Sequence, residues 1–268
     1  MKTTFHLLTG VCGIVLACSG CATNPITGRS QASVVSDAEA ARESTRAYSQ
    51  LVSQAQVQGA LETNPQTIAR VRRITERLVP QAVQLRPETR SWRWEVHVIR
   101  SKEVNAWCMA GGKMAVYTGL LSTIQPTDDE LAQVMAHEIS HALLSHQAEK
   151  MSRVQMQKTG LQLGVLAGAM AGYNLQGVAG LADTAATVAL QLPNSREAES
   201  EADSVGIRLA AQAGYDPRAA VTLWEKMRRV SGAGSMELLS THPSPQSRIE
   251  AMRVLAEKYL PVYQQRKF

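Results

Sequence analysis

The chain has 268 residues, of which 44% are hydrophobic, and this size fits one globular domain with short appendages. The net charge of +5 is spread along the chain without a basic run, and only 4% of the residues are aromatic, so composition argues against a nucleic-acid partner. Three of the four cysteines, Cys12, Cys18 and Cys21, lie near the N-terminus, which excludes a disulfide framework or a cysteine-based zinc site around Cys108.

The first residues, MKTTFHLLTGVCGIVLACSGC, predict a targeting segment, because a positive charge precedes an apolar stretch that is too short for an ordinary membrane span. A small residue before a cysteine is typical of a bacterial lipoprotein signal, here residues 1–20. Cys21, which precedes a polar sequence, and Cys18, which has an aliphatic residue three positions upstream, are both candidates for lipidation. Neither is followed by aspartate, so we expect a periplasmic protein with a lipid anchor in the outer membrane. The alternative is an ordinary secretory signal or an uncleaved anchor.

Residues 21–62 are polar and predict one or two helices that lean on the main domain, residues 63–268. Apolar residues on one helix face predict a helix over residues 65–79 that ends at Pro80. Alternation of bulky and polar side chains predicts two strands, residues 92–99 and 113–118.

Thr127 and Glu130 have the spacing of a capping box, which predicts a helix that runs from there to about Lys150. Residues 160–182 are rich in glycine and alanine. Polar residues interrupt this stretch, so it favours a tightly packed or mobile helical hairpin over a membrane span. Further helices are predicted at residues 195–213, 216–230 and 246–259.

The helix that begins after Thr127 carries the sequence HEISH at residues 137–141. Since a helix turns once in about 3.6 residues, His137 and His141 project from one face and can hold a single zinc ion. Glu138 beside them can take a proton from a water molecule at the metal. The helix is capped and amphipathic around the motif, which makes a plain surface helix the less favoured interpretation.

His146 does not fit as a third ligand. It stands nine residues after His137, without the glycine that a metzincin HExxHxxGxxH motif requires. A continuous helix also places it away from the face that carries the histidine pair. We expect His146 to face solvent or to lie behind the ligands.

The remaining ligand is expected from a second helix with the sequence SREAESEAD at residues 195–203. Glu199 and Asp203 are four residues apart and share a helix face, so Glu199 can bind zinc while Asp203 orients a ligand imidazole through a hydrogen bond. Glu197 and Glu201 point elsewhere and are expected to be solvated. Without the upstream HExxH, an exposed acidic helix would be the default interpretation.

HEISH followed by SREAESEAD resembles the HtpX-like and CAAX-prenyl-protease-like family of gluzincin metallopeptidases, which pair HExxH with a downstream ExxxD helix. NAWCMAGGKMAVYTGLL at residues 105–121 is similar to a segment of that family, with Ala110 where proline is common; AGYDP and THP also occur there. CATNPITGRSQ resembles the family's periplasmic lipoprotein, LoiP-like branch. The resemblance covers roughly residues 65–255 and implies an α+β, mainly helical gluzincin fold with the HExxH helix beside a small sheet.

The resemblance implies one zinc ion per chain, held by His137, His141 and Glu199, with Glu138 as the general base and Asp203 behind the ligands. It also implies that the strand after the glycine pair is the active-site edge strand, which binds an extended peptide by β-augmentation. A simple turn is the alternative for the two glycines. The residues of this expected substrate strand are Gly111, Gly112, Lys113, Met114, Ala115 and Val116.

His242, in the THP sequence, is a further catalytic candidate. Three roles are open for His242: it occupies the fourth position of the metal and blocks water, it stabilises the oxyanion, or it packs as an ordinary loop residue before Pro243. The implied function is hydrolysis of peptide bonds in unfolded or misassembled cell-envelope proteins, by an enzyme that associates with the outer-membrane assembly machinery. The alternative is a chaperone-like outer-membrane protein assembly factor with a latent or minor peptidase activity.

Overall fold

The computed structural model describes residues 21–170, 191–230, 238, 240, 242 and 246–266. The predicted lipoprotein signal, including Cys18, and the later part of the glycine-rich segment lie outside the described residues. The described elements confirm the α+β, mainly helical class. In chain order they are β1 (Cys21–Thr23), β2 (Ser30–Ala32), α2 (Asp37–Val57), α3 (Pro65–Leu85), the 3-10 helix η1 (Pro87–Ser91), β3 (Glu95–Ile99), β4 (Ala106–Met109), β5 (Lys113–Tyr117), α4 (Thr118–Ile124), α5 (Asp128–Leu143), α6 (His146–Met170), α8 (Arg196–Gln212), α9 (Ala219–Val230) and α11 (Gln246–Arg266).

A three-stranded sheet of order β3-β5-β4 lies at the centre of the fold. β5 is parallel to β3 and antiparallel to β4, so both sides of its backbone pair with neighbouring strands. This corrects the expectation that β5 is an edge strand that binds substrate. An added peptide needs an unpaired backbone edge, and Lys113, Met114, Ala115 and Val116 each pair with both neighbouring strands. Sequence reasoning missed β4, whose residues are all buried and do not alternate in polarity.

The glycine pair forms the turn between β4 and β5. Gly111 and Gly112 both have positive φ angles, 81° and 74°, which favour glycine. A Cβ atom on Gly112 would also come within 2.7 Å of the Trp94 ring. The alternative of a simple turn is therefore the correct interpretation of these two residues, and they are not part of a substrate strand.

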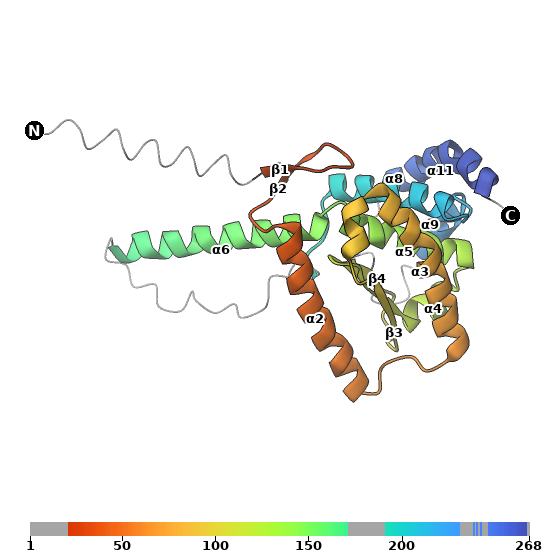
Figure 1. Ribbon diagram of the computed structural model, residues 1–268, viewed down its shortest axis with the longest axis horizontal. Helices are drawn as coiled ribbons and strands as arrows, with labels where there is room; N and C mark the ends of the chain where they lie inside the picture. The colour runs from red at the N-terminus through yellow and green to blue at the C-terminus, as the bar shows by residue number, and fades with distance from the viewer. Residues whose placement is uncertain are drawn as a thin grey trace, which may run out of the picture.

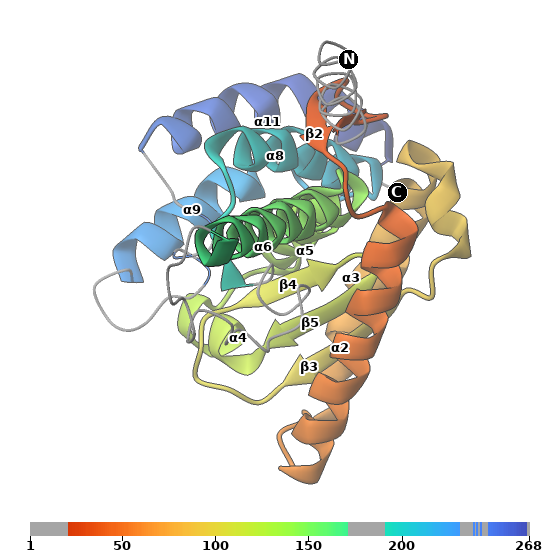
Figure 2. The ribbon, with the colours of Figure 1, turned by 90° about the vertical axis from the view of Figure 1, so that its left-hand side faces the viewer.

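The two faces of the sheet pack against different helices, and in Figure 1 the strands lie between α2 and the pair α3 and α5. Side chains at alternate positions explain this arrangement. Trp107 and Met109 in β4 pack with Tyr48 of α2, while Ala106 and Cys108 belong to the core cluster that includes α3 and α5. Figure 2 shows α2 along one side of the sheet and α8, α9 and α11 beyond α5.

α5 begins as predicted but ends earlier. The capping box is present, since Glu130 N donates to Thr127 Oγ1 and Thr127 N donates to Glu130 Oε2 at 2.8 Å. The predicted continuation to Lys150 is wrong, because Ser145 has a left-handed φ of 57° and α6 starts in a new direction at His146. α6 leaves the compact body as a long arm (Figure 1). None of the helices among the described residues is both long and apolar enough to cross a bilayer.

Two other helices continue further than the sequence predicted. α3 continues through Pro80 to Leu85 and does not end at the proline. Pro80 is exposed, so its ring faces solvent, while buried Ala82 keeps the following turn on the core. The C-terminal helix likewise passes Pro261 and extends beyond the predicted end at residue 259 to Arg266.

Candidate metal centre

The site is built where α5 and α8 approach each other closely. A Cβ atom at Gly206 of α8 would lie 3.0 Å from the backbone N and Cα of His137 on α5. A side chain at this position would push the two helix backbones apart by a few tenths of an ångström, so glycine suits the close approach. Ser195 caps the start of α8 by accepting a hydrogen bond from Ala198 N, so that Glu199 and Asp203, one turn apart, face α5.

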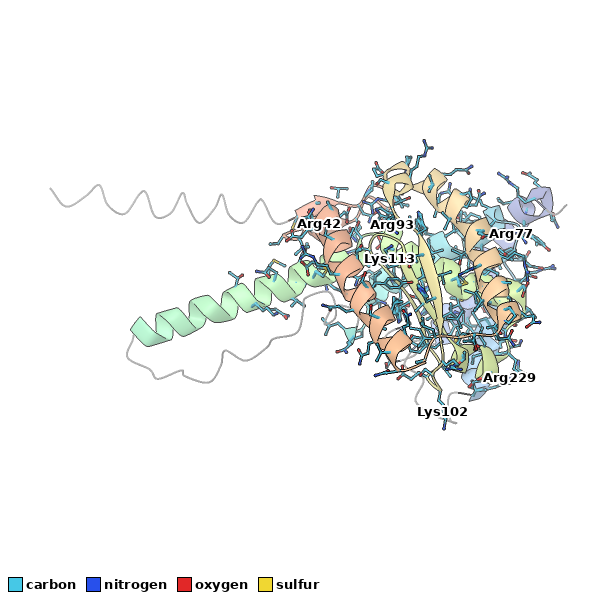
Figure 3. All side chains as sticks on the ribbon, turned by 60° about the horizontal axis from the view of Figure 1, so that its bottom comes forward. Arg42, Arg77, Arg93, Lys102, Lys113 and Arg229 are labelled. Atoms are coloured by element: carbon cyan, nitrogen blue, oxygen red, sulfur yellow. The ribbon has the colours of Figure 1, made fainter. Side chains whose placement is uncertain are left out.

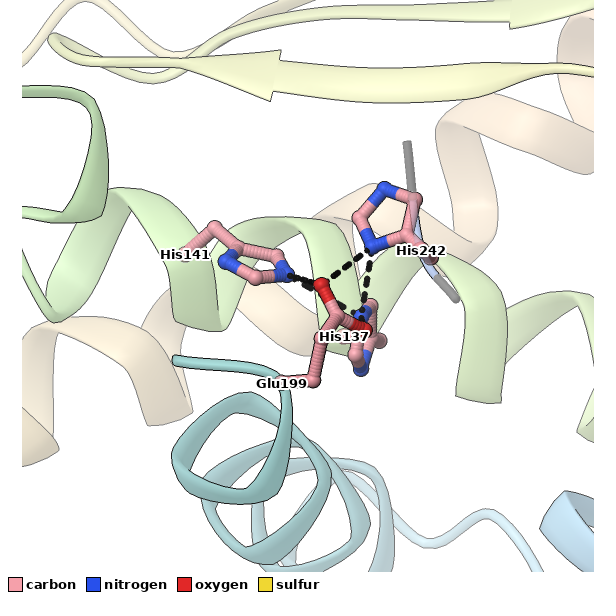
Figure 4. A group of neighbouring side chains, drawn as sticks. All are labelled: His137, His141, Glu199 and His242. Carbon is pink, nitrogen blue, oxygen red and sulfur yellow. Dashed lines mark hydrogen bonds and ion pairs between the residues drawn. The ribbon is translucent and has the colours of Figure 1, made fainter. Parts of the chain in front are cut away.

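Four side chains meet in this place: His137, His141, Glu199 and His242 each contribute one atom to a group within 4.8 Å (Figure 4). The two HExxH nitrogens, His137 Nε2 and His141 Nε2, are 3.0 Å apart. Glu199 Oε1 lies 3.3 Å from His141 Nε2 and 2.8 Å from His242 Nδ1. The structure thus brings the three predicted zinc ligands together with His242, the residue for which the sequence left a role at the fourth position open.

The chemistry of this donor set fits a divalent transition metal. Three imidazoles and a carboxylate, with His141, Glu199 and His242 almost fully buried, converge on one small volume. Burial raises the pKa of Glu199, but hydrogen bonds from His137, His141 and His242 outweigh it and hold that pKa far below its usual value. Glu199 is therefore a carboxylate, the form that binds metal.

Glu138 lies beside the cluster and is 5% exposed. Its Oε1 is 3.4 Å from His242 Nε2. Burial raises the pKa of Glu138 above its usual value, although His242 and His137 oppose the shift. His137 and Glu138 also line a pocket whose other walls are largely apolar, including Val134, Ile207, Leu223, Trp224 and Met227.

Asp203 stands where the sequence placed it, with Oδ1 3.1 Å from His137 Nδ1. Arg248 of α11 was not foreseen. Its Nε and Nη2 donate to the two Asp203 oxygens at 2.8 and 2.6 Å, and its Nη1 lies 2.8 Å from Glu199 Oε2. The guanidinium also sits 4.4 Å from the ring centroid of Trp224. One buried cation therefore holds both acidic side chains of α8 that face the site.

The structure decides between the two expected positions of His146 and corrects the expectation for Glu201. His146 is 2% exposed, and its Nδ1 lies 2.8 Å from His141 Nδ1, so it does not face solvent and lies directly behind a ligand. Glu201 is not solvated: it accepts hydrogen bonds from His146 Nε2 and from Arg29 Nε. The cause is the break at Ser145, which turns His146 back toward the site. Glu197 is exposed, as predicted.

Asn194 also reaches the cluster and was missed in the sequence. Its Nδ2 lies 3.3 Å from His242 Nδ1 and 3.5 Å from His141 Nε2. Its position directly before the helix cap Ser195 is a signal that could have placed it near Glu199. The amide group adds a neutral hydrogen-bond donor to a site that is otherwise made of imidazoles and carboxylates.

The expected substrate residues lie elsewhere. Lys113 is buried against α2, where its Nζ donates to Arg93 O and Glu95 Oε2, and Figure 3 shows Arg93 and Lys113 close together. The strand that packs on α5 is β4. Because Tyr117 N donates to Asn105 O, the alternation of the antiparallel ladder turns the polar backbone groups of Ala106 and Cys108 away from β5.

The fold and the site together define a metallopeptidase of the gluzincin type: an HExxH helix, a glutamate from a second helix, and a small sheet alongside. Residues 65–256 match peptidase family M48, and the chain belongs to that family. This confirms the predicted enzyme class, a metallopeptidase.

Relatives with curated names support this assignment. The chain is 37% identical over 174 residues to a mitochondrial metalloendopeptidase OMA1 from Arabidopsis thaliana, which covers 64% of this chain and 34% of the relative. The corresponding OMA1 of Schizosaccharomyces pombe is 38% identical, with 63% and 47% covered. The beta-barrel assembly-enhancing protease of Escherichia coli is 33% identical, with 62% and 35% covered. The chain thus matches between a third and a half of the length of these relatives.

Proposed function

We propose that this protein is a zinc-dependent endopeptidase that hydrolyses unfolded or misassembled proteins of the cell envelope. The observation that carries the proposal is the convergence of His137, His141 and Glu199 from two helices, with Glu138 beside them. One zinc ion per chain is the expected metal, because imidazole nitrogen and carboxylate oxygen are its usual ligands in peptidases. The family match supports the peptidase role and does not favour the alternative of a chaperone-like assembly factor.

Bound zinc supplies Lewis-acid activation of the attacking water and of the substrate carbonyl. Glu138 accepts a proton from that water and delivers it to the leaving nitrogen. Its burial suits this role, because the raised pKa makes the carboxylate a stronger base than an exposed glutamate. Asp203 accepts a hydrogen bond from His137 Nδ1 and keeps the Nε2 of that ring available for the metal.

His242 acts as a closure of the site in this proposal. Its Nδ1 lies 2.8 Å from Glu199 and its Nε2 lies 3.4 Å from Glu138, so the ring occupies space that a water molecule and a substrate carbonyl need. The resting enzyme is therefore latent, and activity requires His242 to move away. This choice replaces the alternative in which His242 stabilises the oxyanion.

The substrate would add to the outer edge of β4. Leu238 N donates to Val104 O at one end of this edge, and Gln147 Oε1 accepts from Ala110 N at the other end. Between these two ends lie the outward backbone groups of Ala106 and Cys108. An extended peptide that pairs there is recognised through its backbone, which suits unfolded substrates of varied sequence.

The experiment is degradation of casein by the purified protein with zinc, with a chelator and with Glu138→Gln as controls. We expect chelation to abolish the activity and Glu138→Gln to lower it by a factor of about 10² to 10⁴. His242→Ala should degrade casein faster than the wild type. If wild type and His242→Ala are both inert with zinc bound, the proposed proteolysis is wrong, and if His242→Ala alone is inert, His242 assists catalysis.

The proposed location is the periplasmic face of the outer membrane, through a lipid on Cys21 or, alternatively, Cys18. Cys21 is exposed at the start of β1, which leaves room for an acyl chain. Expression of Cys21→Ala and Cys18→Ala with labelled palmitate tests the anchor. We expect only Cys21→Ala to lose the label and to leave the membrane fraction; membrane retention of both variants contradicts the assignment.

A further inference from the structure

His146 occupies the inner end of α6 because the chain turns at Ser145. The left-handed φ of 57° at Ser145 ends α5 and redirects the next residue toward the histidine pair. The His141 and His146 rings are 5.0 Å apart and inclined by 63°, with their Nδ1 atoms 2.8 Å from each other. One ring nitrogen must donate and the other must accept at this distance.

A chain of hydrogen bonds continues from His146 to the N-terminal hairpin, which consists of β1, β2 and the turn between them. His146 Nε2 lies 3.0 Å from Glu201 Oε2, and Arg29 Nε donates to the same oxygen at 2.9 Å. Arg29 also donates through both Nη atoms to Glu149. His146 is 2% exposed and the Glu201 side chain 14%, so these bonds are sheltered from water.

Only one arrangement of protons on neutral rings satisfies this chain when His141 holds a metal. The Nε2 of His141 faces Glu199 and His137, so it is the metal-binding atom, and its Nδ1 then carries the proton. That proton goes to His146 Nδ1, which acts as the acceptor. His146 must carry its own proton on Nε2, where Glu201 accepts it.

We propose that His146 is a positioning residue of the metal site, which fixes the tautomer and the orientation of His141 through a chain that ends at Arg29. His146 does for His141 what Asp203 does for His137. The two ligand histidines are thereby held by different means, one by a carboxylate and one by an imidazole with a carboxylate behind it. This inference rests on the proposed zinc site.

The experiment measures zinc affinity by competition with a chromophoric chelator, and the visible absorption of the Co²⁺-loaded protein. His146→Leu should weaken zinc binding by a factor of about 10 to 100, the usual effect of losing a hydrogen-bond partner of a metal ligand. His146→Asn keeps an acceptor at the position of Nδ1 and should bind zinc nearly as the wild type does. His146→Gln, which replaces only the Nε2 position, should bind nearly as weakly as His146→Leu.

His97→Leu is the matched control. His97 is also partly buried and hydrogen-bonded, to the hydroxyl of Tyr48, but it lies outside the metal cluster. The Co²⁺ spectrum should change in His146→Leu and stay unchanged in His97→Leu, which a purely structural role of His146 would not produce. If His146→Leu fails to fold, the comparison of His146→Asn with His146→Gln decides.

A second pair of variants tests the outer end of the chain. Arg29 and Arg153 both donate to Glu149, but only Arg29 also reaches Glu201. Arg29→Gln should weaken zinc binding several-fold, and Arg153→Gln should leave it unchanged. Equal effects of these two variants on zinc affinity would show that the chain of hydrogen bonds ends at Glu201 and does not include Arg29.

Three results are decisive. Wild-type zinc affinity in His146→Leu overturns the positioning role while leaving the proposed peptidase intact. Equal affinities of His146→Asn and His146→Gln also overturn it, because the Nδ1 contact would then not matter. A wild-type protein that binds no zinc in the same assay overturns the proposed function itself.

Discussion

Arg248 shows what one residue contributes to this site. It is 8% exposed and is bonded to two carboxylates, Glu199 and Asp203, that the fold buries side by side. Two buried carboxylates that lie side by side repel each other unless a cation is shared between them. A guanidinium provides the planar pair of donors that Asp203 requires, which lysine would not.

We predict that Arg248→Met lowers the free energy of unfolding of the metal-free protein by about 3–5 kcal/mol, because the two carboxylates are left buried without their cation. Urea unfolding in the presence of a chelator measures this value. Arg218→Met is the control, since Arg218 pairs with Asp216 on the surface and should change stability by less than about 1 kcal/mol. A small effect at Arg248 would mean that the histidines alone balance the two acids.

At the residue scale, the sequence predicted the groups whose spacing is local. His137 and His141, and likewise Glu199 and Asp203, are four residues apart, so helix geometry alone aligns each pair. Arg248 comes from α11, and no spacing rule connects it to the site, whereas Asn194 lies next to the cap of α8 and could have been found from that position. Glu201 was expected in solvent because its partners, Arg29 and His146, are distant in sequence or lie beyond the bend at Ser145.

At the scale of elements, the distance between α5 and α8 determines whether the two halves of the site meet. Gly206 allows this distance, since any larger side chain would touch the backbone of His137. The sequence predicted both helices and, through the expected ligand set, that they meet at the metal, but not that Gly206 makes the contact. The sequence also did not predict the strand order. The amino-acid sequence of β5 resembles an edge strand of the family, yet β5 pairs with a strand on each side.

We predict that Gly206→Ala destabilises the protein by about 1–3 kcal/mol and weakens zinc binding, because the added methyl group forces α8 away from α5. Gly160→Ala makes the same chemical change on α6, where a Cβ atom meets nothing within 4 Å. That control should be neutral or stabilise the protein by roughly 0.5–1 kcal/mol through helix propensity. Equal destabilisation by both substitutions would refute a special role of the α5–α8 contact.

Because Glu130 of α5 binds residues of α9, we expect the stability of the folded protein to depend on pH in the acid range. Burial raises the pKa of Glu130, but hydrogen bonds from Lys226, Thr127 and Thr222 outweigh it and hold the pKa below the usual 4.5. A carboxyl whose pKa is lowered by folding stabilises the folded state above its unfolded pKa. That stabilisation is lost as the pH falls from about 4.5 through the lower folded value.

Glu130→Gln should therefore lower the free energy of unfolding at pH 7 by about 1–3 kcal/mol and should reduce its decline below pH 4.5. Denaturant unfolding at several pH values measures both effects. Glu225→Gln on α9, the helix that carries Lys226 and Thr222, is the control, because Glu225 pairs with Arg253 at the surface. Glu130 would not be the responsible group if both variants showed the same acid dependence as the wild type.

At the scale of the whole molecule, the N-terminal hairpin joins the catalytic domain across the boundary expected at residue 63. Asn24 Nδ2 and Gln31 Nε2 both donate to the Leu144 carbonyl, at 2.7 and 2.9 Å. This carbonyl belongs to the last turn before the bend and lacks a helical continuation. Residues close to the expected lipid anchor thus complete the end of the HExxH helix.

We predict that removal of residues 21–32 lowers the melting temperature by several degrees and weakens zinc binding, because Leu144 O and Glu149 lose buried partners. Calorimetry should still show a single transition. Val34→Ser, at a side chain that is 48% exposed, should leave the melting temperature unchanged. An unchanged melting temperature after truncation would mean that the hairpin only rests on the domain.

The bend at Ser145 also fixes the number of residues between His141 and His146. A residue inserted between His141 and His146 would rotate the start of α6 by about 100° relative to its present direction and carry His146 away from its partner. A deletion would rotate α6 in the opposite direction and would also separate His146 from His141. A gain or loss of one residue would separate the metal ligand from its support. The number of residues at this junction is thus as strictly required as the histidines themselves.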